Sequence, residues 1–268
     1  MWLFTLVLIL GILCIAFFAL SYAFQTRMLF PTGLATASGS RLPSYAVQLE
    51  VKTPDGEKLR GVHIPSAQGE PAKQLAILGF GGNAWNANTV ASYLHELFPG
   101  VAVFAYHYRG YPPSTGRPSA AALLADAPVV YDHVLETAGT RRVVAVGFSI
   151  GSGVAAYLAK RRRLAGLILV SPFDSLELLA REHFPWAPVR WLLRHHISTV
   201  QYVRGSVTPT SVIAAGRDTI VPPQRTEAVR RSIPALVLDR TIAYADHNDL
   251  YDHPDFKAAM VEALARIE

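Results

Sequence analysis

Cysteine is nearly absent from the sequence. Cys14 is the single cysteine among 268 residues, so no intrachain disulfide can form and the cysteine content indicates no redox compartment. Charged residues are also sparse, at 17%, whereas hydrophobic residues reach 51%. This balance excludes a disordered chain. The length allows one large α/β domain or two small ones, and we expect one because no linker interrupts the chain after residue 45.

Two further absences narrow the choice of partners. No group of His, Cys or Asp residues has the spacing of metal ligands, and His195 and His196 are adjacent rather than on one helical face. We therefore expect neither a metal nor a cofactor. The basic residues form no stripe with interleaved aromatics, so no nucleic-acid partner is expected. The net charge of +5 and the pI of about 9.4 instead favour an anionic surface such as phospholipid.

Charge is missing altogether from residues 2–24, which are almost wholly apolar. A helix of this length spans a bilayer core of about 30 Å. Residues 1–26 are therefore predicted to be a single-pass anchor in a plasma membrane or bacterial inner membrane. A cleavable secretory signal is the alternative, with Tyr22-Ala23 as part of a cleavage site. It fits less well, because no Lys or Arg precedes the run and the run exceeds the usual apolar core of about 7–15 residues.

Residues 27–44 are rich in Gly, Ser, Pro and Thr, and we predict a linker between the anchor and the domain. Arg27 and Arg41 follow the span, whereas only the α-amino group precedes it. The positive-inside rule then favours a cytoplasmic domain. Two arginines leave a periplasmic or extracellular domain as an alternative.

From residue 45 onward, strand and helix patterns alternate. Predicted strands are residues 45–52, 59–64, 75–80, 101–106, 142–148, 167–170, 211–215 and 235–241, the first two flanking a Pro-Asp-Gly hairpin turn. Predicted helices are residues 88–98, 119–137, 151–163, 222–232 and 254–267. This alternation predicts an α/β fold for residues 45–268, with a mostly parallel central sheet flanked by helices. Residues 172–207 break it and predict either a small helical cap after the sixth strand or an extra packing pair of helices.

The strongest chemical signal is Gly-Phe-Ser-Ile-Gly at residues 147–151, where an apolar strand meets an apolar helix. A sharp strand-to-helix turn holds its apex residue with strained backbone angles and an exposed side chain. Gly147 and Gly151 allow the two elements to approach closely, so Ser149 is presented as a nucleophile at a helix N-terminus.

A serine nucleophile needs a base, which in turn is oriented by an acid. In this fold both follow the serine, at the carboxyl ends of later strands. His247 follows the last predicted strand and is the predicted base. Asp218 follows the strand at residues 211–215 and is the predicted acid, with Asp174 as the alternative. Asp246 adjoins His247 and is poorly placed to bond its ring.

An acyl-transfer site also needs N–H donors for the oxyanion. One is predicted at Ile150, directly after the nucleophile. The second is predicted in the loop after residues 75–80, at Asn83 with Gly82 as an alternative, because Gly81 and Gly82 allow close backbone approach to a ligand.

These motifs together resemble the α/β-hydrolase superfamily over residues 45–268, and more narrowly its membrane-anchored branch near serine-aminopeptidase-like and lipase-like sequences. The matching segments are YRGYPPSTGRPS, GGNAWN, GFSIGSGVA, SPFDSL, GRDTIVP and HNDL. The sequence departs from that pattern at Gly81, where the family usually has His, at Pro112 and at Asp246, where it usually has Gly. The resemblance implies a structural, ion-paired role for Arg109.

The resemblance also implies serine-hydrolase activity on esters or thioesters through a covalent acyl-enzyme. Lipid-like acyl substrates would suit an anchored enzyme with an aromatic cap. A serine peptidase of the aminopeptidase type is one alternative, and it would need an acidic pocket for the substrate amine. A non-catalytic binding protein on a hydrolase fold is the other.

Overall fold

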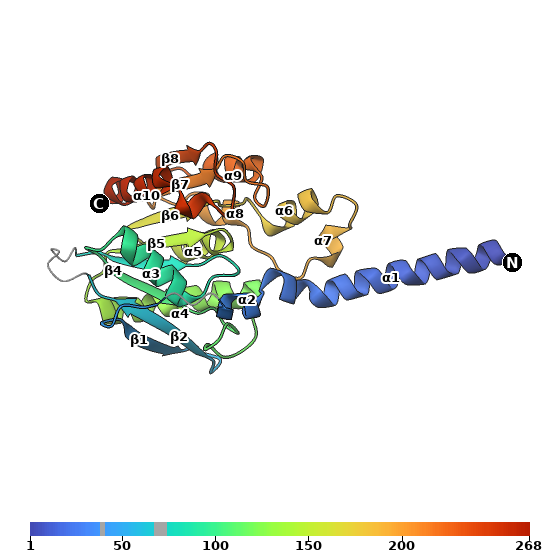
Figure 1. Ribbon diagram of the computed structural model, residues 1–268, viewed down its shortest axis with the longest axis horizontal. Coiled ribbons are helices and arrows are strands. Elements are labelled where there is room, and N and C mark those ends of the chain that lie inside the picture. Colours follow the sequence, from blue (N-terminus) through green and yellow to red (C-terminus); the bar gives the residue numbers. More distant parts are fainter. Residues whose placement is uncertain (38–40, 67–73) are drawn as a thin grey trace.

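An eight-stranded sheet forms the centre of the computed structural model, which describes residues 1–37, 41–66 and 74–268 (Figure 1). The strands are β1 (Val47–Lys52), β2 (Lys58–Ile64), β3 (Ala76–Phe80), β4 (Ala102–Tyr106), β5 (Val143–Phe148), β6 (Gly166–Val170), β7 (Thr210–Ala215) and β8 (Leu236–Ile242). Their order is β1-β2-β4-β3-β5-β6-β7-β8. Strand β2 pairs antiparallel with both β1 and β4, and all the other neighbouring strands pair parallel. The predicted mostly parallel sheet is confirmed.

Helices cover both faces of the sheet. Residues of α3 (Ala87–Leu97) and α10 (Pro254–Ile267) share one apolar core cluster with one face. Residues of α4 (Ala120–Ala138), α5 (Ile150–Arg161) and α9 (Pro223–Arg230) share a second cluster with the opposite face. Every residue of β3, β5, β6 and β7 is buried, as expected for parallel strands covered on both sides. The carboxyl ends of these strands are therefore held rigidly, and they carry the candidate site.

Helix α1 (Trp2–Leu29) projects away from the domain (Figure 1). Its 28 residues extend about 42 Å at 1.5 Å per residue. The segment reaches a mean hydropathy of 3.0, and none of its most apolar stretch is buried. By length and composition this helix can cross a bilayer, in agreement with the predicted anchor.

The segment after the anchor is more ordered than the predicted linker. Helix α1 continues to Leu29, and a second helix, α2 (Thr32–Ala37), follows. Phe30 and Ala35 are buried in the core, and the side-chain amide of Asn86 donates to the Ala35 carbonyl at 2.8 Å. The reason is that Phe30 has an apolar site to fill, which outweighs the loop-forming composition around it. Residues 38–40 of the predicted linker lie outside the described residues.

The predicted helical segment after the sixth strand is present. It contains α6 (Leu176–His183), α7 (Val189–Leu192) and α8 (Thr199–Val203), all between β6 and β7. Ser175 caps α6 by accepting the Leu178 N–H at 3.1 Å. We refer to residues 176–194, which contain α6 and α7, as the cap.

Two polar side chains of α1 tie the anchor to the cap. The Gln25 amide donates to the Leu192 carbonyl at 2.7 Å and accepts the Arg194 N–H at 3.0 Å. One residue later, the Thr26 hydroxyl lies 2.9 Å from Nε2 of His195. The end of the apolar helix is therefore joined to the end of the cap by hydrogen bonds between the Gln25 side chain and the main chain, in addition to side-chain packing.

Replacing Gln25 by Ala is expected to loosen the end of the cap. Each lost hydrogen bond is worth about 1 kcal/mol, so amide exchange at Arg194 should become roughly five- to tenfold faster. Hydrogen–deuterium exchange of the full chain in detergent measures this. Gln201→Ala, on α8, is the control and should leave that exchange unchanged. An unaltered rate in the Gln25 variant would show that this joint does not hold the cap.

Candidate active site

Ser149 stands at the tight turn between β5 and α5. Its backbone has φ +51° and ψ −116°, the strained conformation expected at the apex of such a turn. A Cβ on Gly147 would lie 2.4 Å from the Gly151 carbonyl, and a Cβ on Gly151 would lie 2.2 Å from the Phe80 carbonyl. Real side chains do not tolerate such distances. Gly147 is thus required for β5 and α5 to approach as they do, and Gly151 is required for the turn to approach the end of β3. Ser149 is left half-buried.

The three side chains predicted as a triad form one chain of hydrogen bonds. Nε2 of His247 lies 3.2 Å from Oγ of Ser149, and Nδ1 lies 2.7 Å from Oδ2 of Asp218. The other carboxylate oxygen of Asp218 accepts the N–H groups of Ile220 at 3.0 Å and Val221 at 2.6 Å. An ionised carboxylate only accepts, so Nδ1 donates to it and Nε2 is left to accept the serine proton.

Topology brings these residues together. Ser149 follows β5, Asp218 follows β7 and His247 follows β8, so all three lie at the carboxyl edge of the sheet. Asp218 and His247 are buried, at 5% and 6% exposure, which protects their hydrogen bond from competition with water. The arrangement can deprotonate a hydroxyl held in a defined position, which is the first requirement of nucleophilic catalysis by serine.

The alternative acid, Asp174, is engaged elsewhere. Its Oδ2 lies 3.0 Å from a guanidinium nitrogen of Arg225, and its Oδ1 accepts the Ser175 N–H at 2.6 Å. Burial raises the pKa of Asp174, and the hydrogen bond from Ser175 and the charge of Arg225 oppose that rise. The carboxylate bonded to the His247 ring is therefore that of Asp218.

Asp246 makes a different contact with the histidine. Its carboxylate accepts the main-chain N–H of His247, and its own N–H donates to Asp249 at 2.7 Å. The acidic residue that replaces the family's usual glycine thus stabilises the turn that carries His247, without reaching the ring.

Two tyrosine hydroxyls hold the loop after β3 in place by hydrogen bonds. The Tyr108 hydroxyl donates to the Gly81 carbonyl at 2.9 Å, and the Tyr111 hydroxyl donates to the Asn83 carbonyl at 2.8 Å. Burial raises the pKa of both phenols, which keeps them protonated as donors. A Cβ on Gly82 would lie 3.9 Å from that of Ser149, so the backbone of this loop borders the serine. Ile150 directly follows Ser149 in the chain, and Gly82, the alternative to Asn83, borders it in space. The role of Ile150 and Asn83 as oxyanion donors stays a prediction.

Sequence reasoning did not identify these tyrosines as supports of the site. Their signal was the spacing in Tyr-Arg-Gly-Tyr, which places both rings on one side of a turn around Arg109. The predicted ion pairing of Arg109 is confirmed: its guanidinium contacts Asp126, which is buried, and Asp55, which is exposed. Arg109 thereby fixes the loop that carries Tyr108 and Tyr111.

Val90 and Trp85 together explain why glycine replaces the family's histidine at position 81. A Cβ on Gly81 would lie 2.8 Å from Val90 and 3.0 Å from the Cβ of Trp85. The Trp85 ring packs 5.1 Å from Phe148 and 4.8 Å from Tyr251, measured between ring centroids. Trp85 therefore occupies the space beside the loop, and a side chain at position 81 has no room.

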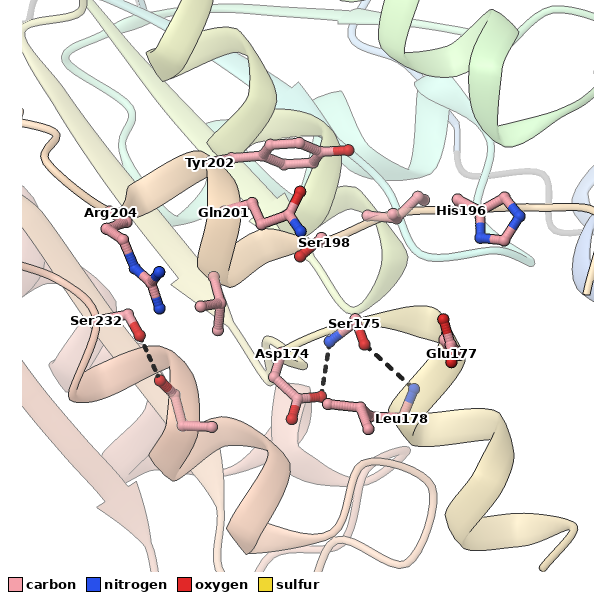
Figure 2. Close-up of a pocket in the computed structure, with 13 residues that line it drawn as sticks. Asp174, Ser175, Glu177, Leu178, His196, Ser198, Gln201, Tyr202, Arg204 and Ser232 are labelled. Atoms are coloured by element: carbon pink, nitrogen blue, oxygen red, sulfur yellow. Dashed lines mark hydrogen bonds between the residues drawn. The ribbon is translucent and has the colours of Figure 1, made fainter. Parts of the chain in front are cut away.

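A polar cleft of about 730 Å³ lies between α6, α8 and α9. Figure 2 shows Asp174, Ser175, Gln201 and Arg204 around it, with Asp174 turned toward the Ser175 N–H. Ser149 does not line this cleft. Within residues 1–37, 41–66 and 74–268, no group of three or more His, Cys, Asp or Glu side chains could hold a metal ion.

Comparison with known proteins agrees with this fold. The family profile for the alpha/beta hydrolase fold matches residues 75–196. An uncharacterized protein of Mycobacterium tuberculosis is 35% identical over 204 residues, covering 74% of this chain and 71% of that protein. An uncharacterized membrane protein of Saccharomyces cerevisiae is 30% identical, covering 75% of each. The esterase Pf2001 of Pyrococcus furiosus has the same fold, with a TM-score of 0.67 at 20% identity, covering 85% of this chain and 96% of its own.

The fold is the mostly parallel α/β type, covered by helices on both faces, that the family profile describes. The chain belongs to the alpha/beta hydrolase family, which confirms the resemblance carried by its motifs.

Acid is expected to destabilise the fold through His107, which follows β4 in the loop of the two tyrosines. Burial lowers the pKa of His107 to about 4. The unfolded chain takes up this proton near pH 6.5 and the folded chain does not. Stability is therefore lost as pH falls from 6.5 to 4, by about 3 kcal/mol from this group. Urea unfolding at several pH values should show that the free energy of unfolding falls less steeply with decreasing pH in His107→Gln than in the unaltered protein. Equal slopes of this free energy against pH in the two proteins would contradict the assignment.

Proposed function

We propose that this protein is a membrane-anchored serine hydrolase that cleaves carboxylic ester or thioester bonds. The observation that carries the proposal is the continuous hydrogen-bonded chain from the Ser149 hydroxyl through His247 to Asp218. The esterase named among the structural neighbours and the membrane protein among the relatives support the class of reaction and the location.

In the proposed mechanism, Oγ of Ser149 attacks the acyl carbonyl while Nε2 of His247 takes its proton. Asp218 holds the imidazole in the required tautomer and stabilises the imidazolium. The N–H groups of Ile150 and Asn83 bind the oxyanion of the tetrahedral intermediate. The bond from the acyl carbon to the leaving oxygen or sulfur then breaks, and the imidazolium gives its proton to the departing alkoxide or thiolate, which leaves an acyl-serine. Water, activated by the same histidine, hydrolyses this ester and restores the serine.

The environment of the cap disfavours the peptidase alternative. A site for a substrate amine needs an unpaired carboxylate, and the acidic residues of this region are already paired. Asp174 and Glu182 both contact Arg225, at 3.0 and 2.9 Å, and Glu177 contacts Arg181 at 2.8 Å. The non-catalytic alternative is disfavoured because all three members of the candidate triad are present and hydrogen-bonded.

A fluorophosphonate probe tests the nucleophile. Ser149→Ala should lose labelling completely, and His247→Gln should slow it by about 10²-fold or more, because the serine loses its base. Ser198→Ala is the matched control, since this serine lines the polar cleft, and its labelling should equal that of the unaltered protein. Labelling of Ser149→Ala at the unaltered rate would overturn the proposal.

Substrate comparison tests the bond that is cleaved. We expect kcat/KM for p-nitrophenyl esters to exceed that for aminoacyl p-nitroanilides by at least about 100-fold, equivalent to about 2.7 kcal/mol of transition-state discrimination. The reverse preference would favour the peptidase. Absence of turnover of either substrate at high enzyme concentration would favour the binding protein.

A further inference from the structure

An apolar groove runs between the anchor helix and the cap. It has a volume of about 380 Å³ and joins a smaller cleft of about 210 Å³. The walls come from one face of α1 and from the facing side of the cap. The larger part is lined by Phe17, Phe18, Ser21, Gln25, Met28, Ala180, Phe184, Trp186, Ala187, Val189, Leu192 and Leu193. Both Gln25 amide atoms are used in the joint to the cap, so the groove offers a ligand almost only apolar surface.

The position of the groove along α1 places it at the edge of the bilayer. A hydrocarbon core of about 30 Å corresponds to about 20 helical residues, which from Trp2 ends near Ser21. The Trp186 ring lies 5.7 Å from that of Phe17 and 6.3 Å from that of Phe18. Along α1, Phe17 and Phe18 lie about 5 Å inside the edge of the hydrocarbon core near Ser21. Trp186 is 62% exposed and Trp191 is 83% exposed, which is costly in water but favourable at a membrane interface.

Three arginines lie next to the groove, at the level of the lipid headgroups. A second cleft, of about 590 Å³, adjoins the end of α1 and is lined by Arg27, Arg117 and Arg194. None of the three forms an ion pair with another part of the described chain. The Arg194 guanidinium instead lies 4.9 Å from the ring of Tyr22. Unpaired cations and aromatic rings just beyond an apolar span complement anionic lipid headgroups.

A hydrogen bond links the inner end of the groove to the loop that carries Asp218. The smaller cleft shares Ala180 and Phe184 with the larger and is also lined by Leu176 and His183. Nε2 of His183 lies 2.8 Å from the carbonyl of Ile220, a residue whose N–H donates to the Asp218 carboxylate. A residue that lines the groove is thus hydrogen-bonded to the loop that supports the candidate triad.

We propose that this groove binds the hydrocarbon chain of a bilayer lipid ester and is the lateral port through which that ester reaches Ser149. The port role rests on the proposed function, whereas chain binding does not. The cap lies in the membrane interface, the arginines bind the anionic headgroup region, and the chain slides along α6 without crossing water.

Blocking the groove tests the port. Ala180 lines both parts, so Ala180→Trp should obstruct it, and Leu178→Trp on the same helix faces the polar cleft and is the matched control. The full chain is assayed in nanodiscs of phosphatidylcholine with phosphatidylglycerol. We expect Ala180→Trp to lose about tenfold or more in kcat/KM for p-nitrophenyl palmitate and less than about twofold for the butyrate. Equal losses for both esters, no loss, or a selective loss in Leu178→Trp would overturn the proposal.

Chain binding is measured separately by fluorescence. A variant in which Trp186 is the single tryptophan is placed in nanodiscs whose acyl chains are brominated near the headgroup. Trp186 should lose most of its fluorescence, and a second variant with Trp85 alone should lose little. Unquenched Trp186 would overturn the groove and leave the serine mechanism intact if Ser149 is still labelled. Strong quenching without turnover of any ester would support the groove and overturn the proposed hydrolase function.

Discussion

The structure depends on one close approach, that of the turn between β5 and α5 to the end of β3. A Cβ on Gly151 would lie only 2.2 Å from the Phe80 carbonyl oxygen, so only glycine fits at this position. This contact forces Ser149 into a backbone conformation that few residues adopt, and it brings the loop of Gly82 next to the serine. Packing on both faces of the sheet supplies the free energy that holds the strained turn.

Much of this was predictable because it is encoded locally. Gly147, Ser149 and Gly151 mark the turn by their spacing within five residues, although the contact of Gly151 with Phe80 is not local. Asp218 and His247 follow predicted strands. Parallel topology then brings the ends of β5, β7 and β8 to one edge, so the meeting of three distant side chains follows from a rule about connections rather than from a sequence pattern.

What the sequence could not predict depends on which surfaces meet. The room beside Gly81 is taken by Trp85, which comes from the same loop but packs against Tyr251 more than 160 positions later. The ordered helix after the anchor depends on the burial of Phe30, although its neighbours have the composition of a linker. The hydrogen bonds of Tyr108 and Tyr111 depend on where the carbonyls of the loop after β3 lie. The contacts of Trp85 and Phe30 leave no periodic or spacing signal, and the spacing of Tyr108 and Tyr111 does not name the carbonyls that they bind.

The joint at Gln25 has a mechanical consequence. An apolar helix adjusts its tilt to the thickness of the surrounding hydrocarbon. Because the Gln25 side chain is bonded to the main chain at Leu192 and Arg194, a tilt of α1 pulls on the backbone of the segment that follows α7. Lipid composition, acting only through thickness, would then reposition α6 and with it the His183 contact to the Asp218 loop.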